Sequence, residues 1–98
     1  MEQSEIIGRA TRAERWLADE TTRQAFGGVR AAILDELARL PVDDIQNLQR
    51  LKIMLGLLEK LKSVIELFVR DGKIAREALE KERNAFQRVK ETLFLLRR

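Results

Sequence analysis

The chain lacks cysteine, histidine and tyrosine altogether. No disulfide framework or thiolate chemistry is therefore available, and the commonest metal ligands, general bases and nucleophiles are missing too. Ser4 and Ser63 have no base partner to activate them. Glu77 and Glu80 are spaced to lie on one helix face beside basic neighbours, where a solvated ion-pair network is the expected role. We expect a protein that is not an enzyme and that uses no cofactor and no metal.

Long apolar runs are absent as well. The longest, from Ile53 to Leu58, has six residues including a glycine, whereas a membrane-spanning helix needs about 20. The first five residues, Met-Glu-Gln-Ser-Glu, carry the wrong charge for a signal peptide. We therefore expect no contact with a membrane.

Proline and glycine are scarce, with one proline and five glycines among 98 residues. Hydrophobic residues make up 45% of the chain and charged residues 36%, a balance typical of a helical protein. We predict an all-α fold and one helical domain over residues 1–98. It comprises an N-terminal helix pair (1–43) and a long oligomerisation helix (44–98).

The first helix is predicted to run from about Ser4, as its N-cap, to about Leu17. Trp16 is the only tryptophan, and we interpret it as an anchor for helix packing, with ligand or base stacking as the alternative. Loops as short as Ala18 to Glu20 make neighbouring helices antiparallel or sharply angled.

The second helix is predicted to begin at Asp19 or at Thr21, which has the capping-box spacing to Gln24. Pro41 ends it at Leu40. Asp43 is then expected to cap the third helix, with Gln46 at capping-box distance.

Gly27 and Gly28 fall inside the predicted second helix, where each glycine costs about 1 kcal/mol relative to alanine. Either another helix approaches closely at this pair, or the helix tolerates it. No phosphate-binding glycine motif accompanies the pair.

The third helix carries apolar or small residues at alternating steps of three and four, the repeat that keeps one seam of a helix against a partner. This seam consists of Leu51, Met54, Leu58, Leu61, Ile65, Phe68, Gly72, Ala75, Leu79, Glu82, Phe86, Val89, Leu93 and Leu96. The repeat predicts one long coiled-coil-like helix, with any kink at Asp71-Gly72. Glu82 is the one charge on the seam. We expect it either to extend outward or to set the register of an oligomer against Arg76 or Arg83.

A continuous helix over residues 44–98 would span about 80 Å, whereas a compact chain of this size has a radius of gyration of about 13 Å. The first two helices can cover only the first half of such a helix. The uncovered apolar residues predict an oligomer interface at Leu79, Phe86, Val89, Leu93 and Leu96.

The alternative fold is a four-helix bundle, in which the chain turns back at Asp71-Gly72 with Gly72 as a left-handed C-cap. The two folds predict different effects for Gly72→Ala. A continuous helix should gain about 1 kcal/mol of stability, whereas the turned-back helix should lose stability.

Charge is divided unevenly along the chain. Residues 1–43 hold six basic and eight acidic side chains, a net charge of −2, and residues 44–98 hold thirteen and eight, a net charge of +5. Basic residues recur at multiples of seven beside the seam and form a basic edge: Lys62, Arg76, Arg83, Lys90 and Arg97, with Arg98 following. A solvated flank is the favoured interpretation, an acidic protein partner the next, and nucleic acid the third, because no aromatic residues alternate with the basic ones.

Several short motifs resemble a group of small helical proteins that tailed bacteriophages and prophages encode among their structural and packaging genes. The motifs are Asp19-Glu20, Ala25-Phe26, a helix ending at Pro41 before acidic residues, and a leucine-rich helix reaching Asp71-Gly72-Lys73. The resemblance covers roughly residues 12–80. It carries no functional residues with it.

The missing chemistry and the uncovered helix predict a non-enzymatic, homo-oligomeric protein, and the resemblance implies a phage structural or assembly role: a capsid-associated, scaffold-like or connector component. It would act in the host cytoplasm or in the virion, with other phage structural proteins as further partners. The alternatives are a small nucleic-acid-binding or packaging accessory protein and a phage-encoded inhibitor of a host protein.

Overall fold

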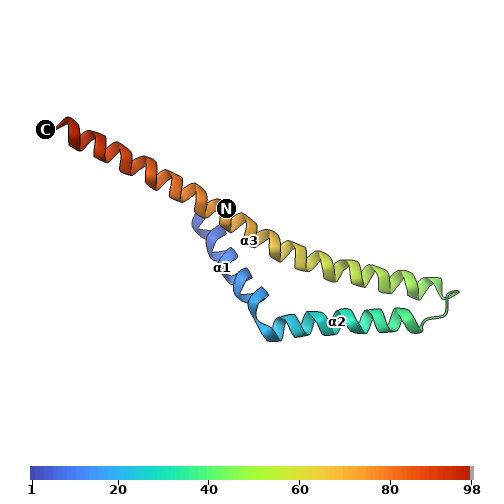
Figure 1. The fold of residues 1–98 in the computed structure, drawn as a ribbon. Coiled ribbons are helices and arrows are strands. Elements are labelled where there is room, and N and C mark those ends of the chain that lie inside the picture. The colour runs from blue at the N-terminus through green and yellow to red at the C-terminus, as the bar shows by residue number, and fades with distance from the viewer. Residues whose placement is uncertain (98) are drawn as a thin grey trace.

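A computed structural model describes residues 1–97 of the chain. Arg98, expected at the end of the basic edge, lies outside the described residues. The described residues form three α-helices and no strand: α1 (Gln3–Ala18), α2 (Glu20–Arg39) and α3 (Ile45–Leu96). The prediction of a short helical hairpin followed by one long helix is confirmed (Figure 1).

Helix α3 is continuous over 52 residues, and it gives the molecule principal extents of 84 × 25 × 17 Å and a radius of gyration of 23.0 Å. Gly72 lies inside this helix, and no described glycine has a positive φ angle. The left-handed cap that a turned-back chain requires is therefore not formed. The four-helix-bundle alternative is wrong.

Aspartates at two of the helix starts accept hydrogen bonds from the first turn. Asp19 caps α2, since its carboxylate accepts from the backbone N–H of Thr22 at 2.8 Å and from the Thr22 hydroxyl at 2.9 Å. These two bonds lower the pKa of Asp19 below its ordinary value. Of the two predicted caps, Asp19 is the residue used.

Two of the predicted caps are wrong. Helix α3 is capped by Asp44, which accepts from the Asn47 side chain at 2.9 Å, because Asp43 is used in the turn that follows Pro41. Helix α1 begins at Gln3, so that Ser4 lies within its first turn and makes no cap.

Helix α1 crosses α3 at a point where both helices carry small residues. Ala10 has no exposed surface, Ala75 is 6% exposed, and Gly72 is buried as well. A Cβ atom added at Gly72 would overlap the Cβ atom of Ala10, with Ile6 O only 3.6 Å away. The prediction that Gly72→Ala stabilises a continuous helix is therefore wrong, because the helix is continuous and the side chain has no room.

Helix α2 returns alongside the first half of α3, as Figure 1 shows. Ile33 of α2 is 5% exposed, and the leucines of α3 that are half-buried in this half include Leu51, Leu55 and Leu58. At the junction of α1 and α2, the rings of Trp16 and Phe26 meet edge to face with centroids 5.0 Å apart. Trp16 thus contacts α2, in line with its predicted role in helix packing, although it is 37% exposed.

The core of the described chain is thin. Its buried apolar residues are Ala10, Ala13, Ile33 and Ala75, and no large side chain among residues 1–97 is fully buried. Three of these four are alanines, which bring little apolar surface out of water. None of the helices described for residues 1–97 combines the length and the apolar composition needed to cross a bilayer.

Candidate interaction surface of helix α3

One face of α3 is turned away from α1 and α2 over most of its length and borders α1 at its middle, where Asp71 and Ala78 are half-buried. Its positions recur every three or four residues with a mean step close to the 3.6 residues of a helical turn, so they share one face of a straight helix. We call this face the α3 strip. It consists of Ile53, Leu57, Lys60, Val64, Leu67, Asp71, Ile74, Ala78, Glu82, Ala85, Val89, Thr92 and Leu96.

Apart from the half-buried Ala78, the apolar side chains of the α3 strip are exposed to solvent in the described chain. Ile53 and Leu57 are each 63% exposed, and Ile74 is 57% exposed. Thr92 turns its hydroxyl back to the Arg88 carbonyl at 3.0 Å, so its hydrogen-bonding need is met within the helix. The strip therefore presents an apolar surface interrupted by only three charges.

Beyond Leu79, α3 continues as an arm (residues 80–96) on which every described residue is exposed. Of the predicted interface residues, Leu79 is half-buried at the base of the arm, and the other four lie on the arm. Phe86 is 61% exposed, Val89 55%, Leu93 54% and Leu96 76%. In Figure 1 the arm, coloured orange to red, extends past both other helices.

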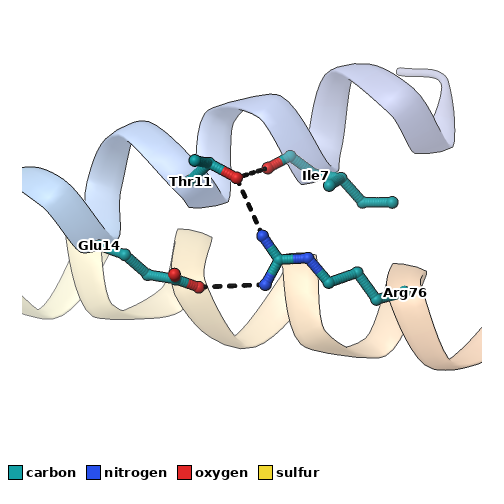
Figure 2. Close-up of polar contacts among 4 residues, drawn as sticks. All are labelled: Ile7, Thr11, Glu14 and Arg76. Atoms are coloured by element: carbon teal, nitrogen blue, oxygen red, sulfur yellow. Dashed lines mark hydrogen bonds and ion pairs between the residues drawn. The ribbon is translucent and has the colours of Figure 1, made fainter.

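Arg76 of the predicted basic edge faces α1 instead of a partner. Its Nη1 donates to Glu14 Oε1 at 3.2 Å and its Nη2 donates to Thr11 Oγ1 at 2.9 Å. The Thr11 hydroxyl in turn donates to the Ile7 carbonyl at 3.0 Å. Figure 2 shows this chain of contacts joining α1 to α3. We call the contacts of Arg76 with Glu14 and Thr11 the clamp. Because the side chains of Arg76 and Glu14 are each 44% exposed, the clamp contributes only modestly to stability.

The other members of the basic edge are not gathered into one site. Lys62 lines a groove of about 610 Å³ between the α1–α2 junction and α3, while Arg83 is exposed on the arm and Arg97 is exposed just beyond it. The ammonium of Lys90 lies 4.8 Å from the centroid of the Phe86 ring. With Arg76 engaged by α1, the edge offers no unbroken row of basic side chains.

The groove is lined by residues of all three helices, which include aromatic, aliphatic and charged side chains. Trp16, Phe26 and Gly27 lie on one side, and Leu58 and Glu66 of α3 on the other. An added Cβ at Gly27 or Gly28 would have no neighbour within 4 Å. Within the described chain, helix α2 thus tolerates the glycine pair without a close contact. Residues 1–97 contain no cluster of three or more His, Cys, Asp or Glu side chains able to hold a metal.

A second contact of α1 with α3 lies beside the middle of the strip. The Arg9 guanidinium carbon is 4.0 Å from the centroid of the Phe68 ring, and Arg9 Nη2 is 3.8 Å from Asp71 Oδ2. Arg9 Nε is buried and has no acceptor among the described residues. Glu82 is exposed and joins none of the ion pairs of residues 1–97.

The seam and the α3 strip coincide only in part. In the first half of α3, seam residues such as Leu51, Leu58 and Ile65 are half-buried, on the side of α3 where α1 and α2 pack. Met54 and Leu61 of the seam are nevertheless 45% and 50% exposed. The more exposed Ile53 and Leu57 fall between seam positions, and the predicted interface did not include them. Counting apolar residues at a 3.6-residue period over residues 53–96 would have found them.

Searches for similar proteins return nothing: no family model matches the chain, and no curated protein and no solved structure matches it. The fold and the surface define the class: an extended all-α protein whose long helix packs on a short helical hairpin and leaves a long apolar face exposed.

Proposed function

We propose that the chain is a non-enzymatic, homo-oligomeric structural protein whose copies associate through α3. The observation that carries this proposal is the exposed apolar surface of α3, which includes both the arm and the strip. Each large apolar side chain left in water forgoes about 1.5 to 3 kcal/mol of burial free energy.

The total surface of the chain supports the same proposal. The chain exposes 8165 Å², whereas a compact monomer of 11.4 kDa exposes about 5,800 Å². The excess of roughly 2,400 Å² exceeds the roughly 800 Å² that one partner gives up in a standard interface and is of the size found in obligate assemblies. Together with the thin core, it supports a protein whose stability depends on association.

The proposed setting is the assembly of a phage virion, as a capsid-associated, scaffold-like or connector component. The resemblance of residues 12–80 to small phage-encoded helical proteins supports this setting. A specific observation against the nucleic-acid alternative is the engagement of Arg76 by Glu14 and Thr11. We therefore favour protein partners over DNA or RNA.

Sedimentation velocity of matched arm variants tests the proposal. Val89→Glu places a charge on the α3 strip, whereas Gln87→Glu places the same charge on the opposite side of the arm. We expect Val89→Glu to dissociate the assembly and Gln87→Glu to leave it intact, because only the former buries a charge on association. Equal behaviour of the two variants would contradict the proposal.

A further inference from the structure

The α3 strip carries a regular pattern of charge. Its three charged residues are Lys60, Asp71 and Glu82, which are separated by 11 residues each, or about three helical turns. Lys60 is positively charged, whereas Asp71 at the centre and Glu82 are negatively charged. Asp71 has a partner within the chain, since Arg9 lies 3.8 Å away, whereas Lys60 and Glu82 join none of the ion pairs of residues 1–97.

Distance excludes a bond between the two outer charges within one chain. Lys60 and Glu82 are 22 residues apart on a continuous helix, which separates them by about 33 Å along its axis. Any direct coupling between them must therefore act between two molecules.

The helix is also centred on this pattern. Helix α3 runs from Ile45 to Leu96, so its midpoint falls between Arg70 and Asp71. If a second copy lay antiparallel to it about Asp71, the two helices would overlap along almost their full length. Each Lys60 would then face Glu82 of the other copy, and each Glu82 would face Lys60.

A parallel pairing of the same strips gives the opposite electrostatics. Lys60 would face Lys60, Asp71 would face Asp71 and Glu82 would face Glu82, so every charged layer would hold like charges. Like charges placed together at an interface weaken the wrong pairing, whereas opposite charges fix its register.

The apolar residues fit the antiparallel arrangement as well. The arm of one copy, residues 80–96, would lie along residues 46–62 of the other, where Ile53 and Leu57 are each 63% exposed. Phe86, which is 61% exposed, would lie level with Gly56 and close to Leu57 of the other copy. Each arm would cover the surface that α1 and α2 leave open.

From this juxtaposition we infer that a second copy of the chain packs antiparallel along the α3 strip, with reciprocal Lys60–Glu82 ion pairs about a two-fold axis at Asp71. At the two-fold axis the two Asp71 side chains would lie close together, and in each copy Arg9 lies beside Asp71. The guanidinium reduces repulsion between the two carboxylates, and its Nε atom, buried without an acceptor among the described residues, gains a second carboxylate nearby. This inference rests on the proposed self-association and adds its geometry.

Spin labels measure the direction of the helices directly. The chain has no cysteine, so Gln87→Cys gives a single label on the arm, away from the strip. In the antiparallel dimer the two labels stand about 50 Å apart, since each lies 16 residues from the axis, whereas a parallel dimer brings them to about 20 Å. A pulsed dipolar measurement that returns the long distance supports the inference, and the short distance overturns it.

Charge reversal gives an independent readout of the Lys60–Glu82 pair. Lys60→Glu or Glu82→Lys alone should weaken dimerisation about tenfold by sedimentation equilibrium, because each reversal creates two like-charge contacts in the dimer. Combined in one chain, the reversals should restore the dimer to within a few-fold of the original. Additive effects of the two reversals would refute the pairing. Circular dichroism of each variant shows that the exposed substitutions leave the helices formed.

The two proposals fail in different ways. If the labelled protein gives no intermolecular distance and sediments as a folded monomer, self-association itself is wrong. If it sediments as a dimer with a short distance between labels, self-association stands and the antiparallel arrangement is rejected.

Discussion

At the scale of single residues, the crossing of α1 over α3 depends on the absence of one side chain. Gly72 and Ala10 meet where the two helix backbones come close. Gly72→Ala gains helix propensity, but overpacking at such a contact costs typically 1 to 3 kcal/mol. We expect a net loss of about 1 kcal/mol or more, measured by urea denaturation followed by circular dichroism.

Gly28→Ala is the matched control for this substitution. An added Cβ at Gly28 has no neighbour within 4 Å, so the variant should gain up to about 1 kcal/mol from helix propensity alone. Ala10→Gly combined with Gly72→Ala should recover part of the loss. If Gly72→Ala stabilises the protein as much as Gly28→Ala does, the close crossing is not formed in solution.

Arg76 and Arg83 make a second matched pair. Arg76→Gln loses the ion pair with Glu14 and the bond between Arg76 and Thr11, and we expect a loss of about 0.5 to 1 kcal/mol because both charged side chains are partly exposed. Arg83→Gln, on the exposed arm, should leave thermal stability unchanged. A similar loss from both substitutions would argue against the clamp.

The cap of α2 should give a pH dependence below about pH 4. The ionised form of Asp19 accepts both bonds from Thr22, which lowers its pKa in the folded chain. Its contribution is therefore complete above the ordinary pKa of an aspartate and is lost as the pH falls through the lowered value. The Thr22 amide resonance in an NMR titration should report this change, and Asp19→Asn, which keeps an acceptor without titrating, should abolish it.

At the scale of elements, the arm is the part of α3 on which every described residue is exposed. Isolated helices of this length are marginal in water, so the proposed association should supply most of the protection of its backbone amides. Hydrogen exchange at residues 80–96 should slow as protein concentration rises, while exchange near Gly72 depends less on concentration. Strong protection of the arm at the lowest concentrations would contradict this account.

The elements themselves were largely predictable from the sequence. Pro41 marked the end of α2, and the apolar repeat through Gly72 correctly indicated a continuous α3. The predicted N-cap of α3 was wrong, because Asp43 and Asp44 are adjacent candidates and only the backbone turn after Pro41 decides between them. The role of Gly72 was misjudged because its neighbour, Ala10, lies 62 residues away in the sequence.

At the scale of the whole molecule, the interaction surface was only partly predictable. A period of 3.5 residues led to the seam, whose members Phe86 and Val89 are exposed on the arm. In the first half of α3, tertiary packing half-buries Leu58, Ile65 and Phe68 of the same seam. Ile53 and Leu57 are exposed for that reason, and the heptad pattern alone does not indicate them.

We expect the chain to be stable only when it associates with other copies, because its thin core of small residues cannot offset much conformational entropy. Thermal unfolding should therefore depend on protein concentration, with a midpoint that rises as the concentration is raised. Val89→Glu should remove this dependence, whereas Gln87→Glu should retain it. Scanning calorimetry over a range of concentrations checks both.

Sedimentation equilibrium of the unmodified protein tests the central claim most directly. The account predicts a mass of at least twice the 11.4 kDa of one chain, falling toward that of one chain only on dilution and with loss of helix. A folded, solitary 11.4 kDa species that persists to high concentration would contradict it.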